Sequence, residues 1–180
     1  MKRKLKVFAI SGSTRIDSTN ESILKLIAEQ FSKVAELEIF KQLSLLPHFN
    51  PDMKGDNVPD IVKDFLNKIE HADGVFICTP EYVFSLPGSL KNALEWCVAA
   101  TVFSDKPVGF IVASGLGDKA FESLDLILST LVQSPVPADC MLLISGGRSV
   151  INKERKLNNE IVAGKLKATF QAFLNKIPNL

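Results

Sequence analysis

Residues 5–20 read LKVFAISGSTRIDSTN, and this stretch decides the fold. It begins with an apolar run from Leu5 to Ile10, interrupted only by Lys6, which predicts a buried strand. A polar segment from Gly12 to Asn20 follows, after which apolar residues recur at helical spacing. A strand that passes through a short loop into a helix is the first part of a βαβ unit, from which parallel sheets are built.

The same alternation continues along the chain. Further strands are predicted at Leu37 to Phe40, Gly74 to Cys78, Val108 to Ala113 and Met141 to Ile144. Residues 41–58 are rich in turn-forming residues and predict a loop, and Pro59 suits the first turn of the next helix. The apolar stripes that predict helices are Ile23, Leu24, Ile27, Ala28 and Phe31; Ile61, Val62, Phe65, Leu66 and Ile69; Leu90, Ala93, Leu94, Cys97 and Val98; Phe121, Leu124, Leu128, Leu131 and Val132; and Val162, Leu166, Phe170, Phe173, Leu174 and Ile177.

Near-continuous apolar strands that alternate with amphipathic helices indicate a parallel sheet covered on both faces. Five such units in 180 residues fit a three-layer, flavodoxin-like α/β fold with a five-stranded parallel sheet in the order 2-1-3-4-5. A single domain over residues 1–180 is expected, because the chain contains no repeat and no linker. In such a sheet, ligands bind at the carboxyl ends of the strands where the order reverses, between strands one and three.

Composition and charge exclude several classes of partner. A formal net charge of +1 gives no reason to expect a nucleic acid, and the basic residues between Lys2 and Lys6 are interpreted as a solvated end. No apolar stretch approaches the ~18 residues that a membrane span needs. Cys78, Cys97 and Cys140 lie far apart in apolar sequence, which indicates buried free thiols, and neither histidine lies near them at a metal-ligand spacing. We therefore expect a cytoplasmic protein with no membrane partner and no metal site.

The loop from Gly12 to Asn20 has the residues of a phosphate site. The first turn of a helix leaves backbone N–H groups unpaired and carries a partial positive charge, so an anion binds well there. Ser13, Ser18 and Asn20 can add side-chain donors, and Arg15 adds a positive charge whose planar fork suits phosphate oxygens. The run Ser18 to Glu21 also fits a capping box, in which Glu21 returns a hydrogen bond to the Ser18 backbone. The alternative is that Ser18 only caps the helix and Arg15 is a solvated loop residue.

Two further loops follow strands three and four. Thr79 to Gly88 carries Tyr82, the only tyrosine, between Pro80 and Pro87, and such a stiff aromatic loop can line the edge of a flat heterocycle. The small residues from Ala113 to Asp118 allow a ligand to approach the backbone. Ordinary strand-to-helix connections would explain both loops as well. Because the loops after strands one and three both lie at the reversal point of the sheet, together they indicate a mononucleotide site, best suited to a flavin.

These loops resemble the NADPH-dependent FMN reductase family, which includes quinone, chromate and azo-dye reductases. The family signature G-S-x-R-x-x-S-x-N is matched at every fixed position between Gly12 and Asn20. A second signature, P-E-Y-N-x-S-x-P-G-x-L-K-N-A-x-[DE]-W, is matched between Pro80 and Trp96 except at Val83, where the family usually has asparagine. The matching positions of the second signature are Pro80, Glu81, Tyr82, Ser85, Pro87, Gly88, Leu90, Lys91, Asn92, Ala93, Glu95 and Trp96.

The resemblance implies a non-covalently bound FMN. Its phosphate would be held by the first loop, its isoalloxazine ring flanked by the second, and the far edge of the ring contacted by the third. Val83 can still offer its backbone N–H to the ring, but it lacks the amide of asparagine. The implied cofactor-binding residues are Ser13, Arg15, Ser18, Thr19 and Asn20; Pro80, Glu81, Tyr82 and Val83; and Ser114, Gly115 and Gly117.

The resemblance further implies an NAD(P)H-dependent oxidoreductase with a ping-pong cycle. Hydride would pass from NADPH or NADH to the flavin, and then to a small acceptor such as a quinone, an azo compound, a free flavin or a metal oxyanion. This chemistry needs no side-chain acid or base, so no catalytic residue is assigned, and Glu81 is interpreted as a supporting or exposed carboxylate. A homodimer or homotetramer is expected. The alternatives are a flavodoxin-like electron carrier that does not oxidise NAD(P)H directly, and a flavin-free relative.

Overall fold

The computed structural model describes residues 3–146, 150–152 and 157–178. Its five strands form one parallel sheet in the order β2-β1-β3-β4-β5, which confirms the predicted fold class and strand order. β1 and β3 are the central neighbours where the order reverses, so the loops that leave them open onto the same edge of the sheet. The strands are β1 (Leu5–Ser11), β2 (Ala35–Phe40), β3 (Gly74–Thr79), β4 (Val108–Ser114) and β5 (Met141–Ser145).

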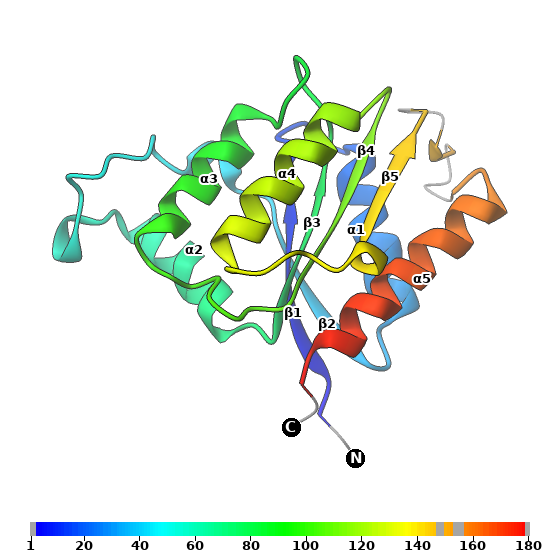
Figure 1. Cartoon of the computed structure of the whole chain (residues 1–180), viewed down its shortest axis with the longest axis horizontal. Coiled ribbons are helices and arrows are strands. Elements are labelled where there is room, and N and C mark those ends of the chain that lie inside the picture. The colour runs from blue at the N-terminus through cyan, green and yellow to red at the C-terminus, as the bar shows by residue number, and fades with distance from the viewer. Residues whose placement is uncertain (1–2, 147–149, 153–156, 179–180) are drawn as a thin grey trace.

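Helices cover both faces of the sheet, as Figure 1 shows. They are α1 (Thr19–Gln30), α2 (Asp60–His71), α3 (Gly88–Val98), α4 (Asp118–Leu131) and α5 (Glu160–Lys176). α1 and α5 share one face, where Phe31 meets Phe170 with ring centroids 4.8 Å apart. The other three cover the opposite face, where Phe8 of β1 meets Phe65 of α2 at 5.9 Å. Among the helices of the described ranges, none is long and apolar enough to cross a bilayer.

The element boundaries differ from the sequence prediction in small ways. β2 begins at Ala35, two residues before the predicted start, and Pro59 occupies the N-cap position of α2 rather than its first turn. The loop over residues 41–58 is confirmed, with only short 3₁₀ turns at Leu43–Leu45 and Gly55–Asn57.

One predicted core position is wrong. Val98 is 63% exposed, whereas Trp96, which was not assigned to the apolar stripe of α3, is 3% exposed. The reason is a covering segment: the Trp96 indole N–H donates to Pro47 O at 2.9 Å, and its ring packs edge-on against Phe49. The loop before α2 therefore buries a side of α3 that helical periodicity alone places in solvent.

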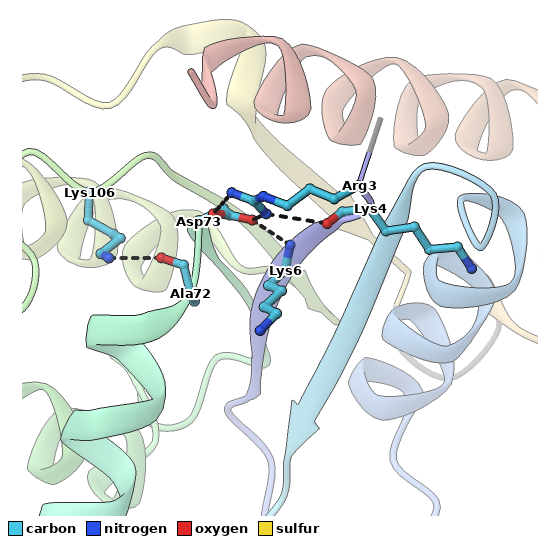
Figure 2. Close-up of polar contacts among 6 residues, drawn as sticks. All are labelled: Arg3, Lys4, Lys6, Ala72, Asp73 and Lys106. Atoms are coloured by element: carbon cyan, nitrogen blue, oxygen red, sulfur yellow. Dashed lines mark hydrogen bonds and ion pairs between the residues drawn. The ribbon is translucent and has the colours of Figure 1, made fainter. Parts of the chain in front are cut away.

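A polar cluster joins the chain at the amino ends of the strands (Figure 2). The two terminal guanidinium nitrogens of Arg3, Nη1 and Nη2, donate to Asp73 at 2.6 and 2.8 Å, and the backbone N–H of Lys6 donates to the same carboxylate at 2.7 Å. Lys106 Nζ donates to Ala72 O at 2.8 Å and so satisfies a carbonyl at the end of α2. Burial lowers the pKa of Lys106 below its ordinary value.

The two ends of the described chain lie beside this cluster. The first described residues lead into β1 next to this cluster. The C-terminal end of α5 lies nearby, because Ile177 is beside Gly74 at the start of β3. The three loops singled out by the sequence lie at the opposite end of the sheet. Of the basic start, Lys2 lies outside the described residues, and Arg3 is a partner of Asp73 rather than a purely solvated residue.

Candidate functional site

The three loops meet around one cavity at the carboxyl ends of β1, β3 and β4. Its volume is about 270 Å³. Nine of the twelve residues that the resemblance implies line it, together with Ala113, which the sequence assigned to the third loop but not to the implied binding residues. The lining residues are Ser13, Arg15, Ser18, Thr19, Asn20, Pro80, Tyr82, Ala113, Ser114 and Gly115.

Gly12 fixes the path of the first loop. Its N–H donates to Cys78 O at 2.8 Å, so the chain leaves β1 pressed against the end of β3. A Cβ atom at this position would lie 2.2 Å from Thr79 Oγ1, which is far inside van der Waals contact. Only glycine therefore permits this approach, which brings Ser13 and Pro80 to the same cavity.

Ser18 has two roles in the structure. Its Oγ accepts the Glu21 N–H at 3.1 Å, so it is the N-cap of α1, and it also lines the cavity. The capping-box prediction is wrong in its second half, because the Glu21 carboxylate makes ion pairs with Lys25 and Lys41, each at 2.7 Å. Partial burial raises the pKa of Glu21, but the hydrogen bonds from the two lysines outweigh it and hold that pKa below its ordinary value.

The side chain of Asn20 accepts a hydrogen bond from the buried thiol of Cys78. Burial raises the pKa of Cys78 well above its ordinary value, so the group remains a thiol, and its Sγ donates to Asn20 Oδ1 at 3.3 Å. Because Oδ1 accepts this bond and Asn20 lines the cavity, its Nδ2 group is the part that could donate to a ligand. Thr19 and Asn20 also belong to the first turn of α1, where backbone N–H groups have no intrahelical acceptor.

The donors of the first loop gather at one side of the cavity. Among the ten lining residues, Arg15 carries the only formal charge. Ser13 Oγ accepts the Arg15 N–H at 3.3 Å and lies 3.5 Å from the Tyr82 hydroxyl, which links the first loop to the second. Ser11 Oγ, at the end of β1, is buried with no hydrogen-bond partner among the described residues. A positive charge, a helix N-terminus and spare hydroxyl and amide donors suit a phosphate monoester.

Three residues of the implied set lie outside the lining. Glu81 turns its carboxylate to α4, where Oε2 accepts the N–H groups of Lys119 and Ala120 at 2.9 and 3.0 Å. This confirms its interpretation as a supporting carboxylate. Gly117 has a φ of 111° at the N-cap of α4, and a Cβ there would lie 2.7 Å from Leu143. Glycine at this position is thus required by the local backbone.

Val83 is the third residue outside the lining, at the tip of a tight turn. Tyr82 N–H donates to Ser85 O at 2.9 Å and Ser85 N–H donates to Tyr82 O at 3.1 Å, which closes a two-residue hairpin. Val83 and Phe84 have φ values of 51° and 56°, the pattern of a type I′ turn. Asparagine and glycine favour this turn, whereas a β-branched residue is strained in it. Val83 is 93% exposed and Phe84 is 72% exposed.

The last part of the second signature builds structure rather than the cavity. Asn92 Oδ1 accepts the Phe49 N–H at 2.7 Å, and its Nδ2 donates to Pro47 O at 3.0 Å, beside the Trp96 bond to the same carbonyl. Lys91 and Glu95 form an ion pair one turn apart, at 2.6 Å. Asn92 and Trp96 thus attach the loop before α2 to α3, whereas the Lys91–Glu95 pair lies within α3, and none of the four side chains lines the cavity.

Comparison with known proteins agrees with this arrangement. Residues 5–147 match the NADPH-dependent FMN reductase family. The NADH:(hydroxy)cinnamate reductase subunit CrdA of Vibrio ruber is 31% identical over 92% of this chain and 84% of its own length. A quinone reductase of Pseudomonas putida is 27% identical over 98% of this chain and 94% of its own.

Solved structures give the same picture. The flavoenzyme NAD(P)H:(acceptor) oxidoreductase FerB of Paracoccus denitrificans superimposes with a TM-score of 0.78 at 25% identity, over 96% of this chain and 97% of its own. The family match spans most of the sequence and includes all three loops of the cavity. The chain therefore belongs to the NADPH-dependent FMN reductase family.

Proposed function

We propose that the protein is an NAD(P)H-dependent FMN reductase that passes electrons to a small acceptor such as a quinone. The observation that carries this proposal is the cavity itself. Its lining combines the N-terminus of α1 and Arg15 with Pro80, Tyr82, Ser114 and Gly115. A site with phosphate-binding groups next to an aromatic ring and small residues suits a flavin mononucleotide.

Different lining residues would bind the phosphate and the ring of FMN. Ser13, Arg15, Ser18, Thr19 and Asn20 would hold the phosphate, and Pro80, Tyr82, Ser114 and Gly115 would flank the ring. Bound FMN supplies the hydride chemistry, taking a hydride from NADPH or NADH and delivering it to the acceptor. The chain itself contributes binding and orientation. The lining offers no carboxylate and no histidine as an acid or base, in line with a site that only positions the reactants.

Flavin binding tests the assignment of the phosphate end. Arg15→Ala should weaken FMN binding by about 10- to 100-fold, because a charge-assisted hydrogen bond contributes roughly 1.5–3 kcal/mol. Riboflavin, which lacks the phosphate, should bind both forms equally. Lys165→Ala, which removes an exposed cation on α5, serves as the control. Equal FMN affinity of wild type and Arg15→Ala in a fluorescence titration at fixed ionic strength would remove Arg15 from the site.

Activity tests the rest of the proposal. The FMN-loaded protein should lose its flavin absorbance when NADPH or NADH is added, and recover it with an acceptor. A panel of quinones, azo dyes, free flavin and metal oxyanions would identify the acceptor. A colourless protein that also ignores added FMN contradicts the proposal, and an FMN protein that NAD(P)H does not reduce directly is an electron carrier instead.

We also propose a homodimer or homotetramer in the cytoplasm. Val98 and Leu126, 63% and 71% exposed, flank a cavity of about 310 Å³ between α3 and α4. Exposed apolar side chains around a hollow are typical of association surfaces. Three unpaired cysteines suit a reducing compartment. Light scattering should give a multiple of the 19.8 kDa chain mass, and Val98→Glu should lower it. A monomer at micromolar concentration would refute the assembly.

A further inference from the structure

Glu81 joins two of the loops that surround the cavity. Its Oε2 accepts the backbone N–H groups of Lys119 and Ala120, at 2.9 and 3.0 Å. Both donors belong to the first turn of α4, where N–H groups have no intrahelical acceptor. Gly117, at the N-cap position, makes no side-chain cap. The carboxylate therefore caps α4 from a loop 38 residues earlier in the sequence.

The backbone of Glu81 reinforces this link. Its carbonyl accepts the Ser114 hydroxyl at 3.5 Å, so the second and third loops are joined through both the main chain and the side chain of one residue. The neighbours of Glu81, Pro80 and Tyr82, line the cavity, and so do Ser114 and Gly115 of the third loop. The contacts of Glu81 therefore connect the two loops that supply these lining residues.

We propose that Glu81 is a positioning residue that sets the spacing, within the cavity, between Pro80 and Tyr82 of the second loop and Ser114 and Gly115 of the third. The proposal rests on the proposed function, because the ligand between these loops is the flavin ring. A carboxylate is well suited to the task, since a negative charge at a helix N-terminus is stabilised by the partial positive charge there. Two charge-assisted hydrogen bonds to one oxygen also fix the side chain more firmly than neutral bonds would.

Flavin affinity is the first test. Glu81→Ala should weaken FMN and riboflavin binding by the same factor, on the order of tenfold, the lower end of the loss caused by removing a supporting group around a metal site. Glu81→Gln, whose amide oxygen can still accept both N–H groups, should recover most of that loss. Glu122→Ala, which removes an exposed carboxylate from the same helix, should bind like wild type. The equal factor separates Glu81 from Arg15, whose loss should affect FMN alone.

Hydrogen exchange of the apoprotein is the second test and involves no flavin. The amides of Lys119 and Ala120 should exchange faster in Glu81→Ala than in wild type, and at the wild-type rate in Glu81→Gln and Glu122→Ala. Should Glu81→Ala fail to fold, Glu81→Asp replaces it, because its side chain is one methylene shorter and its carboxylate falls short of the two N–H groups.

The outcomes separate this proposal from the function on which it rests. If wild type binds neither flavin, the proposed function fails and this proposal fails with it. If wild type binds both and Glu81→Ala binds them equally well, Glu81 is only a helix cap, and the positioning role alone is overturned. A loss for FMN without a loss for riboflavin also overturns it, since that result places the effect at the phosphate.

Discussion

Replacing Val83 by asparagine should stabilise the protein, because the valine is held in a backbone conformation that it disfavours. Its φ is 51°, and a left-handed backbone costs a residue with a Cβ roughly 1–2 kcal/mol. Asparagine tolerates this region and is favoured at the first position of a type I′ turn. Val83 is 93% exposed, so little buried apolar surface is lost with it. We therefore expect Val83→Asn to raise the free energy of unfolding by about 1 kcal/mol.

Urea unfolding of the apoprotein measures this directly. The midpoint should rise with an unchanged m-value, and the melting temperature should increase by about 2–4 °C, as for other domains of this size. Val34→Asn is a matched control: Val34 is also exposed, at 50%, and lies in a turn, but it does not have a positive φ. Because there is no left-handed backbone to relieve at Val34, this control should not show the same gain in stability. An equal gain at both positions, or none at Val83, would refute the argument from backbone strain.

Three further changes test other parts of the fold. Gly12→Ala should cost roughly 1–3 kcal/mol of unfolding free energy in urea, because its Cβ would overlap Thr79; wild-type stability would contradict the close approach. Asn92→Ala should cost a similar amount, about 1–3 kcal/mol, because it leaves the partly buried backbone N–H of Phe49 without its acceptor. Limited proteolysis should then cut the loop over residues 41–58 faster than in wild type. The Arg3 hydrogen bonds hold the pKa of Asp73 below its ordinary value of 3.8, so its contribution is present above that value and is lost as the pH falls through the lower, folded-state pKa. The stability difference between wild type and Asp73→Asn should therefore shrink on acidification, and a difference that grows instead would show the sign to be wrong.

The fold could be predicted from sequence because its signals are local and repeated. Each strand is an apolar run of a few residues, each helix has a periodic stripe, and a parallel sheet of five such units has few possible strand orders. The first loop could also be predicted as a phosphate site, because its nine residues combine a glycine with hydroxyl, amide and guanidinium donors. The structure brings all five of its implied binding residues to one cavity.

The remaining features depend on contacts that sequence patterns do not encode. The partners of the Glu81 carboxylate are two backbone N–H groups 38 and 39 residues away. Almost every residue has a backbone N–H group, so the sequence does not indicate which ones Glu81 will contact. The positive φ of Val83 could not be predicted either, because valine is among the residues least expected to have a positive φ. Trp96 is buried by a loop, and helical periodicity describes only the face that a helix turns to a sheet.

The position of the Arg3–Asp73 cluster has a practical consequence. Because Arg3 and Ile177 both lie at the amino ends of the strands, a surface linker attached close to either residue would leave the molecule there, with the sheet between it and the cavity. Immobilisation on an electrode through such a linker would thus leave the cavity facing the solution, open to incoming nucleotide and oxidant.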